Sequence, residues 1–217
     1  MGLDFSYLLY FKREHLWEAL QGVAAIAEPH HPPTMIHFPD HTMAVPLESW
    51  LLEDRTVQHD DPEFSFSIVL NFEEDEAIED YVYARDRGDA DTERSPPDTE
   101  ETNQVSIGYI YLTVYNDLSR RITLIEPTDL VLFDFGTTGT RMSLLFDYST
   151  SIRKTFIDLL ERCHGLCGVF NREYGGGELF WLKGQSLSEY FEDAYLMPQE
   201  IEGLLRKGRL GDRNDGS

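Results

Sequence analysis

The sequence predicts an α+β fold with a largely antiparallel sheet or sheets, built from two pseudo-repeated β-α-β-β units whose helices pack on one face. Three observations lead to this prediction. A strand pattern followed by an amphipathic helix pattern occurs twice, strands outnumber helices, and most neighbouring strands are joined by hairpin-like turns. The chain has 217 residues, of which 41% are hydrophobic, so it is long enough to bury a substantial core.

The repeated pattern begins with a strand and continues into a helix. In the first copy, Leu3–Phe11 is rich in aromatic and branched residues, and Glu14–Ala27 has apolar residues at helical spacing. Ser6–Ala27 aligns with Ser143–Cys163, and a hairpin is expected after each helix. Because the recurring positions are apolar, the repeat predicts shared packing rather than a duplicated site. The aligned helical pairs are Leu16 with Ile152, Leu20 with Phe156, Val23 with Leu159, and Ala27 with Cys163.

The other strands are expected where short runs of residues are apolar at alternating or successive positions. These runs are Thr34–Pro39, Thr42–Leu47, Glu63–Phe72, Gln104–Tyr115, Leu130–Phe135, Arg141–Asp147, Cys167–Asn171 and Glu178–Leu182. The turn Gly136–Gly139 is expected to join two of them, Leu130–Phe135 and Arg141–Asp147, into a hairpin. Further helices are expected at Asp75–Tyr83, Ser186–Ala194 and Gln199–Arg206.

Composition divides the chain into four segments, which we expect to form one compact domain. Residues 1–84 hold the first unit and one further strand, and residues 104–206 hold the β-rich middle, the second unit and the C-terminal helices. Between them, 85–103 is predicted to be a flexible acidic loop, since it has no large apolar residue to bury. The last segment, 207–217, is expected to be a frayed tail. The wider stretch Glu73–Glu101 contains 13 acidic and 3 basic residues.

The overall charge limits the partners of this chain. The net charge is −22, from 40 acidic and 18 basic residues, so phosphate backbones and anionic membranes are repelled and neither is an expected ligand. A basic protein partner is compatible with this charge, and a homo-oligomer is also possible. No hydrophobic run approaches the ~18 residues needed to span a bilayer. With two cysteines, Cys163 and Cys167, a reduced cytoplasmic protein is expected.

The segment Leu130–Asp147 carries the most specific local motif. Its Asp-x-Gly-Thr-Thr stretch resembles the first phosphate hairpin of the superfamily of actin, heat-shock chaperones and sugar kinases. The resemblance implies phosphate contacts at the following residues: Asp134, Gly136, Thr137 and Thr138. The resemblance ends there, because the chain has no second phosphate loop and no adenosine loop. The alternative, which we favour, is a β-hairpin whose glycines serve the turn.

Histidines and carboxylates gather in the region His30–His41 and suggest a divalent metal site. In the predicted hairpin His37 shares a strand face with Pro39, and the turn adds Asp40 and His41, so imidazole and carboxylate ligands could meet. Glyoxalase-type proteins also place a metal between β-α-β-β-β units, which is an analogy at the level of the fold. The alternative is that these are surface histidines in a loop. No cofactor is predicted.

The sequence favours a non-catalytic protein-binding module over an enzyme, although it leaves the question of catalysis open. No complete catalytic motif is present, and the acidic stretch offers a surface for a basic partner. The candidate contact residues are Glu73, Glu74, Asp75 and Glu76. Bacterial immunity proteins and antitoxins are similar in charge and size. The alternative is a metal-dependent or phosphate-handling enzyme that uses the His30–His41 region or the Asp134–Thr138 turn.

Overall fold

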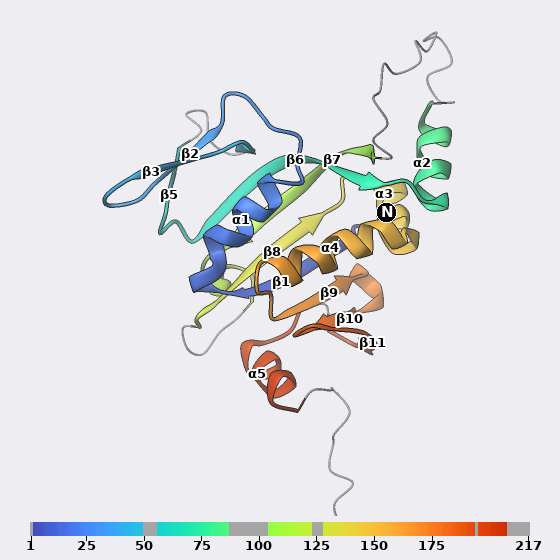
Figure 1. Cartoon of the computed structure of the whole chain (residues 1–217). Coiled ribbons are helices and arrows are strands. Elements are labelled where there is room, and N and C mark those ends of the chain that lie inside the picture. The colour runs from blue at the N-terminus through green and yellow to red at the C-terminus, as the bar shows by residue number, and fades with distance from the viewer. Residues whose placement is uncertain (1, 50–55, 87–103, 123–127, 194, 208–217) are drawn as a thin grey trace, which may run out of the picture.

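An eight-stranded sheet forms the centre of the computed structural model, which describes residues 2–49, 56–86, 104–122, 128–193 and 195–207 (Figure 1). All of its neighbouring strands run antiparallel. The spatial order is β11 (Gln185–Phe191), β10 (Gly177–Leu182), β9 (Cys167–Asn171), β1 (Ser6–Lys12), β8 (Leu130–Gly136), β7 (Gln104–Tyr115), β6 (Glu63–Glu73) and β4 (Glu48–Ser49). The predicted α+β class and large antiparallel sheet are therefore confirmed.

The N-terminal strand β1 lies at the centre of this sheet, between β8 and β9. Its residues Ser6–Phe11 are all buried, which explains why all of them except Ser6 are apolar or aromatic. Strands from both ends of the chain thus share one sheet. A second sheet of three strands lies beside it, with β2 (Thr34–His37) antiparallel to β3 (Thr42–Val45) and parallel to β5 (Thr56–Gln58).

Two helices, α1 (Leu16–Ala24) and α4 (Thr150–Arg162), cover one face of the large sheet (Figure 1). Their apolar positions are those aligned in the sequence, and Leu20 and Phe156 are fully buried. A Cβ on Gly22 of α1 would lie 2.5 Å from the Sγ of Cys163, so the close approach of the helix ends requires glycine there. Beneath them, the ring of Tyr7 stacks on Phe156 with centroids 4.4 Å apart.

The opposite face of the sheet is covered in part by α5 (Pro198–Lys207). Leu196, Ile201 and Leu204 are buried against strand residues of this face, including Tyr10 and Leu132. The helices expected on one face, those of the two units, correspond to α1 and α4 and do share a face, whereas α5 lies on the opposite face. The outward residues of β1, β8 and β9 are apolar at this end of the sheet, and they need a cover of their own.

The predicted repeat of two β-α-β-β units is not confirmed. Leu8–Tyr10 lies in strand β1, whereas the aligned Leu144–Phe146 lies in helix α3 (Thr140–Tyr148). The hairpin expected around Gly136–Gly139 is accordingly a strand, a turn and a helix. The helix forms because Met142, Leu145 and Phe146 stand three and four residues apart and are buried on one side.

The helix expected at Ser186–Ala194 is also corrected: Ser186–Phe191 belongs to the edge strand β11, and residue 194 lies outside the described residues. The exposure of β11 alternates residue by residue, as in a half-buried strand. The remaining α-helix is α2 (Glu76–Asp86). Short 3₁₀ turns occur at Arg13–His15, Leu118–Arg120 and Glu173–Gly175. Residues 87–103 of the predicted acidic loop and 208–217 of the predicted tail lie outside the described residues.

A buried ion-pair network joins the edge of the sheet to the helices. The Glu178 side chain on β10 is 2% exposed. Its carboxylate accepts hydrogen bonds from Arg153 of α4 at 2.9 Å, Arg172 at 3.0 Å and Ser188 of β11 at 3.1 Å. Arg172 also donates to Asp147 of α3 at 2.7 Å. Burial alone would raise the pKa of Glu178, but the two arginines and Ser188 outweigh it and lower the pKa.

We predict that Glu178→Ala destabilises the protein by about 3 kcal/mol, since the substitution leaves two guanidinium groups beside an apolar core without their shared anion. Urea unfolding at neutral pH measures the loss. The matched control is Glu202→Ala, which removes an exposed carboxylate 3.5 Å from Arg206. It should cost less than about 0.5 kcal/mol. Equal losses in the two variants would contradict a structural role for the network.

Candidate functional site

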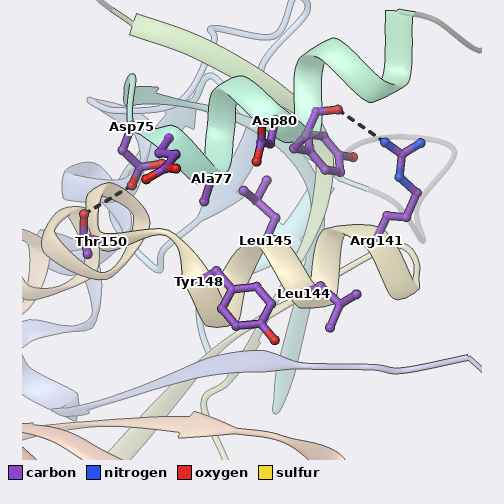
Figure 2. A pocket seen from close by; sticks show the side chains of 10 residues that line it. Asp75, Ala77, Asp80, Arg141, Leu144, Leu145, Tyr148 and Thr150 are labelled. Carbon is purple, nitrogen blue, oxygen red and sulfur yellow. Dashed lines mark hydrogen bonds between the residues drawn. The ribbon is translucent and has the colours of Figure 1, made fainter.

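The clearest surface hollow is a groove between α2 and α3, which we call the α2–α3 groove (Figure 2). It has a volume of about 560 Å³. Figure 2 shows Ala77 of α2 and Leu145 of α3 between the two helices, whereas Leu144 and Tyr148 extend from the side of α3 that faces away from α2 in this view. The lining residues are Asp75, Glu76, Ala77, Asp80, Tyr81, Arg141, Leu144, Leu145, Tyr148 and Thr150.

Asp75 sets the position of α2 relative to the other helices. One carboxylate oxygen accepts from the amide of Ile78 at 3.0 Å, which caps the start of α2. The other accepts from the Ser149 hydroxyl at 2.8 Å and the Ser151 amide at 2.9 Å, at the start of α4. Burial alone would raise the pKa of Asp75, but these hydrogen bonds and one from Thr150 outweigh it and lower the pKa.

The groove combines exposed apolar side chains with an acidic rim. Tyr148 is 70% exposed and Leu144 is 38% exposed, which is unusual for large hydrophobic residues on neighbouring turns of a helix. Glu76 and Asp80 are exposed on the opposite side. Arg141 reaches across to α2, where it stacks over the ring of Tyr81 at 5.7 Å and donates to the Tyr81 carbonyl at 3.5 Å. The groove is therefore amphipathic, with negative charge on its α2 side.

A second hollow of about 480 Å³ lies on the sheet face that carries α5, and we call it the sheet-face pocket. Most of its lining residues have polar side chains, and they come from the four strands β1, β7, β8 and β9 and from segments outside these strands. The lining residues are Asp4, Ser6, Tyr111, Thr113, Arg121, Asp134, Gly136, Thr137, Asn171, Glu173 and Tyr195.

Asp134 of β8 lines the sheet-face pocket, and its side chain is 12% exposed. Its Oδ2 is 3.5 Å from the hydroxyl of Tyr195 and 3.7 Å from the guanidinium of Arg121. Burial, helped by the nearby Asp4, raises the pKa of Asp134 to about 6 against the opposing effects of Arg121 and a hydrogen bond from Ser6. This carboxylate can therefore exchange a proton near neutral pH.

Three of the four residues named by the phosphate resemblance meet in this pocket. Asp134, Gly136 and Thr137 line it, whereas Thr138 contacts the sulfur of Met142 at 3.6 Å. The amide and hydroxyl of Thr137 both donate to the carbonyl of Phe5 at 3.2 Å. These donors are engaged within the protein, and phosphate binding at this turn stays a prediction.

The residues proposed for a metal site lie in and beside the β2–β3 turn. Asp40 accepts from Nδ1 of His41 at 2.7 Å, and the ring of His41 stacks on Phe38 with centroids 4.4 Å apart. Nδ1 of His37 forms a hydrogen bond with the Thr42 hydroxyl at 3.1 Å. Within the described part of the chain, no group of three or more His, Cys, Asp or Glu side chains could hold a metal ion. Both cysteines are buried as free thiols.

The four residues proposed to contact a partner separate into different roles. Glu73 at the end of β6 pairs with Lys154 at 2.9 Å, and Glu74 is exposed. Asp75 and Glu76 line the α2–α3 groove. The α3 side of the groove was not identified from the sequence, because Arg141–Asp147 was expected to be a strand. Its signal was the helical spacing of Met142, Leu145 and Phe146.

No protein-family model, curated protein or solved structure matches this chain. Across the described ranges, no helix is long and apolar enough to cross a membrane. Function is therefore inferred from the two hollows themselves.

We predict that Asp75→Ala destabilises the protein by roughly 1–3 kcal/mol, because it removes the capping acceptor of two helices. Denaturant unfolding measures the loss, and Glu79→Ala, an exposed acid in the same turn of α2, is the control. The pKa of Asp75 is lowered from 3.8, so its contribution is present above pH 3.8 and is lost as the pH falls below it. A difference between wild type and variant that persisted at pH 2 would contradict this origin.

Asp134→Asn should have the opposite effect on stability. The pKa of Asp134 in the folded protein is about 6, against 3.8 for the ordinary group, so ionisation disfavours folding. The wild type should lose stability as the pH rises from about 4 through 6, by at most about 3 kcal/mol. The variant should therefore be more stable than the wild type at pH 8, and the two should have similar stability at pH 4. Thermal unfolding at both pH values measures the difference. Equal stability at pH 8 would contradict the burial cost.

Proposed function

We propose that this chain is a non-catalytic binding protein whose α2–α3 groove receives a basic, amphipathic segment of a protein partner. The observation that carries the proposal is the exposure of Leu144 and Tyr148 along a groove whose other side bears Glu76 and Asp80. A helix laid in such a groove can bury its apolar side chains between α2 and α3 and place lysine or arginine against the carboxylates.

The apolar part supports a macromolecular partner. Large hydrophobic side chains grouped in a hollow and rimmed by polar residues are typical of protein-binding surfaces. Ala77 and Leu145 add apolar lining from the two helices, and both Tyr81 and Tyr148 add aromatic area of the kind that dominates binding energy at interfaces. A volume of about 560 Å³ accommodates a few side chains of a partner helix.

Charge supports a basic partner over an acidic or neutral one. Arg141, the one basic residue among the described residues that line the groove, already contacts Tyr81 through its guanidinium. Asp75 is engaged by both helix starts, which leaves Glu76 and Asp80 as the acceptors that point to solvent. The net charge of −22 attracts a basic partner over longer distances and repels nucleic acid and anionic membranes. A cytoplasmic location is part of the same proposal.

The partner is best identified by photocrosslinking from the groove. A benzophenone amino acid placed at Tyr148 should give an adduct whose crosslinked segment is basic and has apolar residues three and four positions apart. The matched probe position is Tyr190 on β11, which is 66% exposed and does not line the groove. Adducts that are equal at both positions, an acidic crosslinked segment, or a second copy of this chain would overturn the proposal.

Affinity for a synthetic peptide of the crosslinked segment tests the groove quantitatively. Leu144→Asp and Tyr148→Ala should each weaken binding by roughly tenfold, since central apolar residues contribute about 1–2 kcal/mol each. Tyr190→Ala should leave the affinity unchanged, and circular dichroism checks that each variant is folded. Binding should also weaken as salt is raised, because Glu76 and Asp80 are exposed. Full affinity in both groove variants would contradict the site.

The alternative of a metal-dependent or phosphate-handling enzyme stays a prediction. A thermal-shift screen with Zn²⁺, Mn²⁺, Ni²⁺ and ATP with Mg²⁺ examines it. A ligand at 100 times its dissociation constant should add about 2.7 kcal/mol of stability. A shift that is lost in His37→Ala, or in Thr138→Val, would favour that class over the binding module.

A further inference from the structure

We propose that the sheet-face pocket is a second, separate binding site, for a small organic cation with one or two ammonium groups, and that the Asp134 carboxylate is its main acceptor. The pocket lies on the sheet face that carries α5, whereas the groove lies between α2 and α3. The inference does not depend on the groove or on its partner.

The first argument is the division of one sheet face into an apolar and a polar half. Along β1 and β9 the outward residues under α5 are apolar, as at Leu8 and Val169. The next outward residues on these two strands are Ser6 and Asn171, which stand opposite each other in the sheet and line the pocket. The uncovered face of an antiparallel sheet is commonly polar because water solvates it. Ser6 and Asn171, however, are only 6% and 7% exposed, so these polar side chains line a hollow rather than an open surface.

The second argument is the excess of carboxylates around the pocket. Its lining includes three carboxylates, Asp4, Asp134 and Glu173, and one guanidinium, Arg121. Burial and the neighbouring Glu173 raise the pKa of Asp4, with Arg121 opposing, as expected where negative charges are crowded. When all three acids are ionised, the pocket carries more negative than positive charge. An ammonium group, which only donates hydrogen bonds, matches this surplus.

The third argument compares Asp134 with the other buried carboxylate, Glu178. Glu178 is held by two arginines and a serine at 2.9 to 3.1 Å. Asp134 has a hydrogen bond from Ser6, but its charged and phenolic neighbours, Arg121 at 3.7 Å and Tyr195 at 3.5 Å, are distant for a carboxylate that is 12% exposed. The same fold thus pairs one carboxylate closely and leaves the other with room for a further donor.

The fourth argument is that contacts within the protein hold the residues at the edge of the pocket in place. Arg121 is held at the rim, because its guanidinium lies 4.5 Å from the ring of Tyr195 and 5.9 Å from that of Tyr115. The segment of Tyr195 is anchored in turn by the amide of Leu196, which donates to the buried hydroxyl of Tyr10 at 3.2 Å. The volume of about 480 Å³ lies within the usual range for small-molecule sites.

Isothermal titration of the full chain with putrescine tests the proposal, with butanediol of the same carbon chain as the neutral probe. Putrescine should bind and butanediol should not. Asp134→Asn should weaken putrescine binding at least tenfold. The control variant Glu161→Gln changes the charge equally on an exposed acid of α4, outside the pocket, and should change affinity less than twofold. Equal binding of both probes, or equal losses in both variants, would overturn the proposal.

A proton readout on the wild type keeps the test independent of any variant. The groups that face Asp134 are Asp4, Glu173, Arg121 and the tyrosines of the pocket and its rim, Tyr111, Tyr115 and Tyr195. Among these groups, burial raises the pKa of Asp4 and of Tyr115, and it raises the pKa of Asp134 to about 6.

Binding of a cation favours the ionised carboxylate and should release up to about half a proton per site at pH 6. Titrations in two buffers of different ionisation enthalpy measure this release. With a pKa of about 6 for Asp134, the putrescine dissociation constant should rise roughly tenfold from pH 7.5 to pH 5. Affinity independent of pH with no proton release would show that Asp134 is not the acceptor.

Discussion

The arrangement of the helices depends on the carboxylate of Asp75. α2 is an acidic helix, and Ile78 is its one fully buried side chain in the described part of the chain, so hydrophobic burial alone gives it little to hold it in place. Asp75 accepts hydrogen bonds at the starts of both α2 and α4, where the helix dipoles also favour a negative charge. Because α3 ends directly before α4, this contact places α2 opposite α3. The groove therefore exists because one side chain caps two helices.

The face of the eight-stranded sheet that carries α5 has an apolar half and a polar half, and α5 covers the apolar half. Leu196, Ile201 and Leu204 find apolar strand residues under one half of the face. The other half presents Ser6, Asp134 and Asn171, and covering these with an apolar helix would remove water from polar groups without replacing its hydrogen bonds. The packing of α5 on the sheet therefore stops where the strand residues become polar, and Tyr195 lines the pocket that remains there.

Periodicity predicted the parts of the fold that depend on burial along one element. The apolar spacing in Glu14–Ala27 corresponds to α1, and the alternation in Glu63–Phe72 corresponds to β6. It failed at Arg141–Asp147, because a run of seven residues contains both strand-like and helix-like spacings, and tertiary burial decides between them. The sites were less predictable still. Asp134 was singled out by a short motif. Arg121, Asn171 and Tyr195 are distant from it in sequence, and they line the same pocket only because the strands pair and the chain passes this face again before α5.

The carboxylates of the groove and of the sheet-face pocket differ in exposure, so they attract a positively charged ligand in physically different ways. Glu76 and Asp80 are exposed, so at about 0.15 M salt their attraction for a partner is screened beyond roughly 8 Å and adds mainly to the rate of encounter. Asp134 lies at 12% exposure, where screening is weak and the cost of removing the charge from water is already present in the unliganded protein. A cation that reaches Asp134 relieves that cost, whereas a partner at the groove relieves none. Raising the salt concentration should therefore weaken the groove before it weakens the pocket, which separates the two sites without altering a single residue.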